Sequence, residues 1–308
     1  MATLQLTEQV NTTARSVETP ALLVVLAHPD DESFGMGGTL VRYARLGVEV
    51  SLVCATRGEV GDVEPEMLAG HASIAELREG ELRCAAGLLG LKEVHFLGYR
   101  DSGMPGSPEN QNPRALVAQP LELVADEVAH FIRRVRPQVV ITFDPIGGYR
   151  HPDHIFIHRA TVRAFSLASD STFIDPDGLP PYAPQRLFFN TFSRSFLRFV
   201  VWLLRVLGQD PRRYGRNHDI DLTLLTIEDF PIHAEVDFSP VSKIRDQAAA
   251  CHASQGGKDM FRGFRGLVFK LFRRKETYMQ AYPVPETSRG RISDLFVGVE
   301  FSGSAGAD

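Results

Sequence analysis

A run of metal-ligand side chains follows an apolar segment near the start of the chain. Residues 21–27 are all apolar, and His28 then leads through a proline into three consecutive carboxylates, Asp30, Asp31 and Glu32. An apolar run this short predicts a parallel strand that is buried on both faces. Adjacent carboxylates need a compensating charge when they are buried. Since His28 and Asp31 offer one nitrogen and one oxygen ligand, the pattern predicts a cation site at the end of this strand.

A second cluster of the same kind follows another apolar run. Residues 138–143 again have the pattern of a buried strand. The segment after them contains a tyrosine, two histidines and two aspartates, namely Asp144, Tyr149, His151, Asp153 and His154. In chain order the two strands are the first and the fourth, which are neighbours at the switch point of a sheet of order 3-2-1-4-5. The sequence therefore predicts one site built from both strand-end loops.

The alternation of strands and helices predicts the fold class. We expect an α/β fold, with a Rossmann-like, doubly wound and mostly parallel sheet and a C-terminal extension of helices and strands. Segments 48–55 and 93–97 are expected as the second and third strands, and 185–193 as the fifth. Two short strands are expected at 232–237 and 293–301, the last of them at a sheet edge.

One domain is expected over residues 20–308, after a flexible N-terminal arm of residues 1–19 that does not look like a signal peptide. A variable insertion is expected at about 175–235 and an amphipathic segment at about 258–275. This segment and the apolar run 196–207 carry arginines among apolar residues. We expect them to cover the substrate cleft or to form the interface of a homo-oligomer, and contact with an anionic membrane surface is the alternative.

Composition narrows the class of partner and the compartment. With 33 basic and 38 acidic residues and a net charge of −5, nothing indicates nucleic acid as a partner. The cysteines, Cys54, Cys84 and Cys251, are scattered, which favours small buried side chains in a reducing compartment. A cytoplasmic location follows as the expectation. A dinucleotide function is rejected, because the first strand-to-helix turn carries carboxylates that would repel phosphates where a G-x-G-x-x-G loop would bind them.

The two motifs resemble those of a known family. AHPDDE at residues 27–32 and GGYRHPDH at residues 147–154 are similar to the motifs of the LmbE-like (PIG-L) family of zinc-dependent N-deacetylases. The resemblance covers residues 20–165 and returns weakly near 243–255. It implies a hydrolase that removes the N-acetyl group from an N-acetylglucosamine-type glycoside, giving acetate and a free amine.

Two other functions stay open beside this one. An amidase of the thiol-conjugate type would cleave a larger N-acyl group, and it would need a more open pocket. A non-catalytic metal-binding or sugar-binding protein is disfavoured, because all the proposed ligands and the proposed base are present.

The resemblance and the chemistry agree on a metal centre. His28, Asp31 and His154 form a set of two histidines and one carboxylate, which leaves coordination positions free, as in a catalytic zinc site. Asp30 is expected to point away from Asp31 and to act as the general base. Fe²⁺ is the alternative ion, because two histidines and one carboxylate also bind Fe²⁺ in oxygenases.

Further roles are implied by the resemblance. His151 would face the developing oxyanion, as an imidazolium held by Asp153, and Tyr149 would donate to the carbonyl oxygen. Arg78, in an R-x-x-E-L match at residues 78–82, would reach the site and position the substrate, although a solvated charge on a helix face is the other interpretation. Glu32 and Asp144 are expected to orient ligands or to accept from loop amides.

Overall fold

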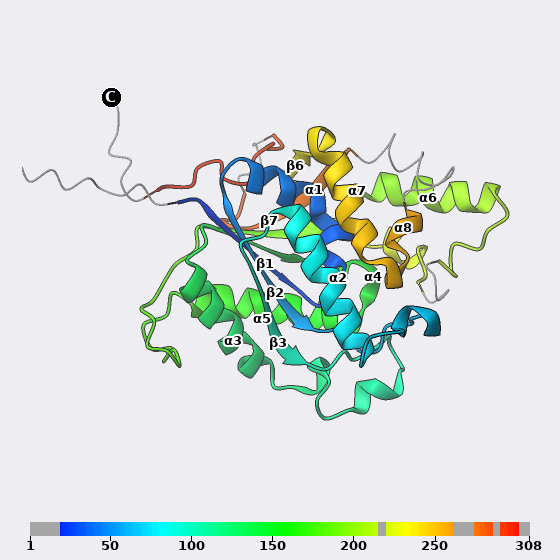
Figure 1. Cartoon of the computed structure of the whole chain (residues 1–308). Coiled ribbons are helices and arrows are strands. Elements are labelled where there is room, and N and C mark those ends of the chain that lie inside the picture. The colour runs from blue at the N-terminus through cyan, green and yellow to red at the C-terminus, as the bar shows by residue number, and fades with distance from the viewer. Residues whose placement is uncertain (1–18, 215–219, 261–273, 286–289, 302–308) are drawn as a thin grey trace, which may run out of the picture.

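The fold is centred on a mixed sheet with strand order β3-β2-β1-β4-β5-β7-β6 (Figure 1). This is a computed structural model, and it describes residues 19–214, 220–260, 274–285 and 290–301. The strands are β1 (Ala21–Leu26), β2 (Glu49–Thr56), β3 (Glu93–Tyr99), β4 (Val139–Phe143), β5 (Arg186–Thr191), β6 (Ala234–Asp237) and β7 (Lys275–Tyr282). The order 3-2-1-4-5 and the α/β class are confirmed.

Helices cover both faces of the sheet. The longer ones are α1 (Asp31–Arg45), α2 (Ile74–Leu89), α3 (Leu121–Val135), α5 (Pro152–Leu167), α6 (Arg194–Val206) and α7 (Ser242–Cys251), and the short ones are α4 (Gly147–Arg150) and α8 (Gly257–Met260). Figure 1 shows α1, α2 and α7 on one face and α3 and α5 on the other, with α6 at one end. The apolar run 196–207 lies almost entirely in α6.

The two central strands bring the ligand-rich loops together. Every residue of β1 and of β4 is buried, as their continuous apolar sequences predict. The two strands pair in parallel, with Leu22 opposite Val139 and Val24 opposite Ile141. Parallel strands end at the same sheet edge, so the segments after Leu26 and after Phe143 emerge side by side. This is the switch point at which ligands bind in such sheets.

The C-terminal region departs from the expectation. Residues 293–301 form turns and irregular structure, so the strand expected there is wrong. The seventh strand is β7, which pairs antiparallel with both β5 and β6. Its inward-facing positions include the polar Glu276 and Gln280, which hid the apolar alternation of a strand. Residues 1–18 of the expected N-terminal arm and 261–273 of the amphipathic segment lie outside the described residues.

Glu276 on β7 braces helix α1. The helix is kinked at Met36, whose φ of −144° is not helical. The carboxylate of Glu276 accepts hydrogen bonds from the backbone N–H groups of Gly38 at 3.0 Å and Thr39 at 2.7 Å, and it is only 4% exposed. Tyr278, also on β7, donates its hydroxyl to Thr39 Oγ1. Polar groups freed by the kink are thereby satisfied inside the core.

The cysteine expectation is also corrected. Cys84 on α2 and Cys251 at the end of α7 form a disulfide, and Cys54 is buried and free. The two bonded residues are 167 positions apart, so their spacing gave no signal that they pair.

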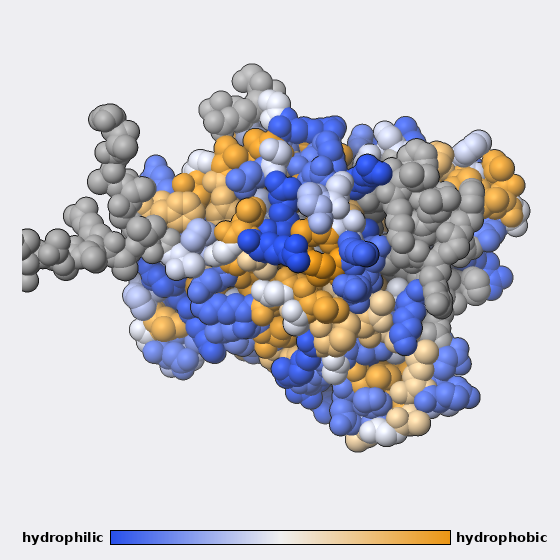
Figure 2. All heavy atoms as spheres, turned by 45° about the horizontal axis from the view of Figure 1, so that its top comes forward, coloured by the Kyte–Doolittle hydropathy of each residue, from blue (hydrophilic) through white to orange (hydrophobic). Residues whose placement is uncertain are grey.

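Helix α6 packs on a small apolar cluster of its own, formed with Leu222 and Leu225, and it leaves Trp202 and Val206 exposed. Figure 2 shows apolar residues at the end of the molecule where α6 lies in Figure 1. Within the described ranges, no helix has the length and apolarity to cross a membrane. Membrane-surface contact, the homo-oligomer and the limits of the insertion stay predictions.

Gly38 lies too close to Phe238 for any larger side chain. A Cβ at Gly38 would lie 2.3 Å from Cγ of the buried Phe238, whereas a Cβ at Gly80 on the exposed side of α2 would meet nothing within 4 Å. We expect Gly38→Ala to lower the free energy of unfolding by about 1–3 kcal/mol. The matched Gly80→Ala should raise it by about 0.5–1 kcal/mol, because alanine favours the helix. Urea denaturation measures both, and equal effects at the two sites would contradict this packing.

Candidate functional site

His28, Asp31 and His154 converge at the shared edge of β1 and β4. His28 Nδ1 lies 3.1 Å from His154 Nε2, which lies 3.3 Å from Asp31 Oδ1. Asp31 Oδ2 is 3.7 Å from His28 Nδ1. Tetrahedral ligands about 2.0–2.1 Å from a zinc ion are about 3.3 Å apart. The spacings of 3.1 and 3.3 Å fit such a set, whereas the spacing of 3.7 Å is longer and involves the other carboxylate oxygen of Asp31. His28 and His154 also form a possible metal-ligand group with His151, so Asp31 and His151 are both candidates for the third ligand.

The ring orientations of both histidines suit this arrangement. His154 Nδ1 lies 3.1 Å from the carbonyl oxygen of Gly147, which can only accept. His28 Nε2 lies 3.1 Å from the Asp153 carboxylate. With the ring proton on each of these nitrogens, Nδ1 of His28 and Nε2 of His154 face the shared space, where a neutral ring can offer its lone pair to a metal ion. The ring of Phe143 stacks on His154 at 3.9 Å and fixes its plane.

Asp153 contacts a different histidine from the one expected. Its carboxylate accepts from His28 and from the backbone N–H of Ser102 at 2.9 Å, and the residue is fully buried. No hydrogen bond of the described residues joins this carboxylate to the His151 ring. His151 is instead the N-cap of α5, and its Nδ1 accepts from the backbone N–H of Asp153. The expected carboxylate–His151 pair is therefore wrong, because capping turns the ring the other way.

The predicted imidazolium at His151 is also corrected. Burial, and the neighbouring His28 and His154, hold the pKa of His151 well below its ordinary value. Because Nδ1 accepts the Asp153 amide, the single proton of the neutral ring is on Nε2. His151 is thus a neutral hydrogen-bond donor.

Asp30 and Asp31 point to different partners although they are adjacent. Asp30 has a φ of 124°, which is unusual for a residue with a side chain, and such strain gathers at functional sites. Its carboxylate lies 3.1 Å from Arg78 Nη2, while its backbone N–H donates to Glu32 Oε2. Burial raises the pKa of Asp30 to about 6, against the opposing charge of Arg78. A carboxylate with this pKa is suited to accept a proton at neutral pH.

Arg78 reaches the site, whereas its predicted role in positioning the substrate stays a prediction. It is only 4% exposed, and it donates to the carbonyl oxygens of Pro29 at 2.7 Å and Gly58 at 2.9 Å as well as to Asp30. A Cβ on Gly58 would overlap the guanidinium, and its φ of +66° also favours glycine. The arginine therefore ties the β1 loop to the β2 loop.

Tyr149 and Asp144 come from the loop after β4. The Tyr149 ring lies edge-on to His154 with centroids 4.8 Å apart. Burial raises the pKa of Tyr149 well above its ordinary value, so its hydroxyl stays protonated and can donate. Asp144 accepts from the backbone N–H of Gly148 at 2.8 Å, and burial raises its pKa to about 6. Asp144 thus serves the loop amides, as expected.

Sequence reasoning missed Asp101 at the end of β3. Its Oδ1 is 3.5 Å from His28 Nε2 and accepts from the Gly103 N–H. Burial would raise the pKa of Asp101, but His28 holds it well below its usual range. The available signal was its position, since β3 ends at the same sheet edge as β1 and β4. His28, Asp101, His151 and Asp153 also lie close enough together to form a metal-ligand group.

The site combines a metal-type donor set at the switch point of an α/β sheet with a separate, half-buried carboxylate, that of Asp30. This combination defines the class of a metal-dependent hydrolase. Residues 23–165 match the family described as PIG-L, GlcNAc-PI de-N-acetylase. The chain belongs to this family, and the expected enzyme class, an N-deacetylase, is confirmed.

Two relatives carry the same name, 1D-myo-inositol 2-acetamido-2-deoxy-alpha-D-glucopyranoside deacetylase. The protein from Thermomonospora curvata is 42% identical over 296 residues, covering 90% of this chain and 96% of the relative. The protein from Thermobifida fusca (strain YX) is 48% identical over 245 residues, covering 76% and 82%. Among solved structures, N,N'-diacetylchitobiose deacetylase from Pyrococcus horikoshii has a TM-score of 0.59 at 22% identity and covers 88% of each chain, which supports the fold.

Removing the Arg78 charge should raise the pKa of Asp30. Arg78→Gln takes away the cation that stabilises the ionised carboxylate, so we expect the pKa to move above about 6 in metal-free protein. Carbon-13 NMR titration of the Asp30 carboxyl group measures this. Arg57→Gln is the matched control, because Arg57 is 49% exposed and pairs with Glu79 instead. An unchanged pKa in Arg78→Gln would disprove the electrostatic coupling.

Proposed function

We propose that the protein hydrolyses the acetamide of 1D-myo-inositol 2-acetamido-2-deoxy-alpha-D-glucopyranoside, releasing acetate and the free amine. The names of relatives that span most of both chains support this substrate. The observation that carries the proposal is the convergence of His28, Asp31 and His154, with Asp30 beside them facing Arg78. No contact of the described residues favours a larger acyl group, so the thiol-conjugate amidase stays the alternative.

In this proposal His28, Asp31 and His154 hold Zn²⁺, with Fe²⁺ as the alternative ion. Asp31 is preferred to His151 as the third ligand, because an ionised carboxylate supplies charge to a divalent cation. His154 and His28 keep the pKa of Asp31 well below its usual range, despite burial, and so favour this charged form. A bound zinc ion lowers the pKa of water and polarises a carbonyl group.

Asp30 is the proposed general base. It accepts a proton from the attacking water and passes it to the nitrogen of the leaving amine as the C–N bond breaks. Arg78 and Glu32 hold it in place through its carboxylate and its backbone N–H. The oxyanion that forms from the acetyl carbonyl would accept from the Tyr149 hydroxyl and from His151 Nε2–H.

The cytoplasm is the proposed location. It rests on the sequence expectation alone, which a fractionation of the native host would test.

Acetate release tests the function and the role of Asp30 together. With 1D-myo-inositol 2-acetamido-2-deoxy-alpha-D-glucopyranoside as substrate, zinc-loaded protein should release acetate, and chelator treatment should abolish the release. Asp30→Asn should lower kcat about 10²–10⁴-fold because it removes the base. Its zinc content should be unchanged, because Asp30 is not among the proposed ligands. Asp126→Asn, on the exposed side of α3, is the control.

Three other outcomes of these measurements lead to different conclusions. A zinc-loaded protein that releases no acetate but cleaves longer N-acyl analogues would favour the larger-acyl amidase. Loss of zinc in Asp30→Asn would mean that Asp30 is a ligand. Protein that binds no metal would overturn the proposal.

The variant Asp153→Asn shows whether the Asp153 carboxylate supports His28 or His151. Because Asp153 contacts His28, we expect about a 10–100-fold loss of zinc affinity, the usual effect of removing a carboxylate that orients a ligand histidine. Competition with a chromophoric chelator measures the affinity. Asp175→Asn is the matched control, since Asp175 pairs with His130, away from the β1 and β4 loops. Unchanged affinity with a lowered kcat would mean that Asp153 acts on His151.

A further inference from the structure

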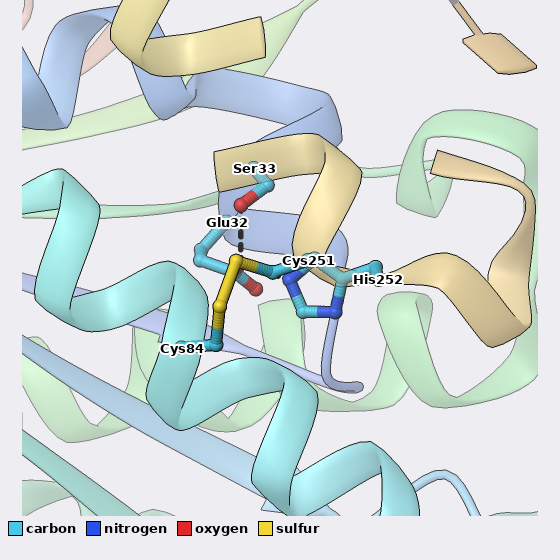
Figure 3. Close-up of a disulfide and its surroundings, with 5 residues drawn as sticks. All are labelled: Glu32, Ser33, Cys84, Cys251 and His252. Atoms are coloured by element: carbon cyan, nitrogen blue, oxygen red, sulfur yellow. Dashed lines mark hydrogen bonds and ion pairs between the residues drawn. A yellow bond between two sulfur atoms is a disulfide. The ribbon is translucent and has the colours of Figure 1, made fainter. Parts of the chain in front are cut away.

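The disulfide joins two helices that reach the proposed base from different sides. Cys84 lies on α2, and Cys251 is the last residue of α7, with their Cα atoms 6.0 Å apart. Figure 3 shows the bond beside Glu32, Ser33 and His252. Cys84 is exposed and Cys251 is half-buried, so a reductant in solution can reach the sulfur of Cys84.

Helix α7 is linked to Asp30 through Glu32. His252 directly follows Cys251, and its Nε2 lies 2.7 Å from Glu32 Oε1 (Figure 3). Both residues are fully buried, and Glu32 raises the pKa of His252 despite burial, which favours a charged pair. The other oxygen of Glu32 accepts the backbone N–H of Asp30 at 3.0 Å. His252 therefore reaches the strained backbone of Asp30 through one intermediate.

Helix α2 is linked to Asp30 through Arg78. This arginine lies on the same helix as Cys84 and bonds the Asp30 carboxylate and the Pro29 carbonyl oxygen. Between them on α2, the buried Glu81 accepts from the N–H of Ser254 at 2.8 Å and from its hydroxyl at 2.7 Å. These bonds join α2 to the turn that follows α7, without the disulfide, so reduced protein should stay folded.

We propose that the Cys84–Cys251 disulfide is a redox-cleavable clamp, which holds α2 and α7 together so that Arg78 and the Glu32–His252 pair fix Asp30 for catalysis. Its reduction lowers turnover by letting these two supports move apart. The inference rests on the proposed function, since Asp30 is the proposed base. In a cytoplasmic protein, a disulfide of this kind is usually transient or redox-sensing.

The reductant is a dithiol, either a small molecule or a protein. One of its thiolates attacks the exposed sulfur of Cys84, the S–S bond breaks, and Cys251 leaves as a thiolate that takes up a proton. The second thiol of the reductant then attacks the mixed disulfide and releases Cys84 as a thiol. Two electrons pass to the protein, and the reductant becomes a disulfide.

The test compares oxidised and dithiothreitol-reduced protein with the same zinc content, after alkylation and mass spectrometry have confirmed the state of each cysteine. We expect reduction to lower kcat at least threefold and to leave KM nearly unchanged, because Asp30 acts in the chemical step. Amide hydrogen exchange should become faster at residues 30–33. The melting temperature should fall by about 5 °C, as loss of a disulfide that closes a long loop implies.

Two variants test whether the effect of reduction depends on this disulfide. Cys84→Ser cannot form the bond, so without reductant it should behave as reduced protein and should not respond to dithiothreitol. Cys54→Ala removes the free cysteine and should keep the full response. Reduced wild-type protein gives the same information if Cys84→Ser does not fold.

The outcomes distinguish the clamp from the proposed function. A lower melting temperature with unchanged kcat and unchanged exchange at 30–33 would overturn the clamp, because the bond would then only stabilise the fold. If neither redox state releases acetate, the proposed function fails, and the exchange at 30–33 still decides whether the disulfide holds this loop. Faster exchange there on reduction would support the clamp, and equal exchange would overturn it.

Discussion

Two consecutive carboxylates must face different partners, and the backbone at Asp30 makes this feasible. With a φ of 124°, Asp30 turns its carboxylate toward Arg78 while Asp31 faces the histidines. A conformation of this kind costs about 1–3 kcal/mol and persists only where the surroundings over-determine it. Here Glu32 accepts the Asp30 amide, and His252 holds Glu32 in turn. The different directions of Asp31, the proposed ligand, and Asp30, the proposed base, therefore depend on groups that α2 and α7 supply.

Charge around His28 explains why this centre suits a divalent cation. Three carboxylates lie within 3.7 Å of its ring nitrogens, from Asp31, Asp101 and Asp153. Burial would lower the pKa of His28, but the charges of these carboxylates hold it well above its ordinary value. Even a protonated His28 would leave two negative charges in a buried space, which is costly in a low-dielectric interior. A divalent cation at Nδ1 would balance them, and the carboxylates at Nε2 would then orient the neutral ring.

The sequence predicted the parts of the site that directly follow a single strand. It did not predict the contacts that depend on the direction in which a side chain points. Apolar runs of β1 and β4, each followed by histidine and aspartate, were enough to predict the strand order and the shared edge. The family resemblance implied that Asp153 holds His151, but the His151 ring caps α5 and the Asp153 carboxylate contacts His28. Strand β7 was not predicted, because the buried Glu276 and Gln280 interrupt the apolar alternation of its sequence. Polar residues that brace a core look like surface residues in a sequence.

The segments beyond the family match give the site much of its support. Residues 23–165 contain every predicted site residue, yet three later elements hold them. Tyr149 packs against the cluster that includes Val201 and Leu204 of α6, so a region expected to be variable contacts a proposed catalytic side chain. The end of α7 supplies His252, and β7 braces the α1 helix that begins at Asp31. Changes in α6 can therefore alter the position of Tyr149 while the motif residues stay the same.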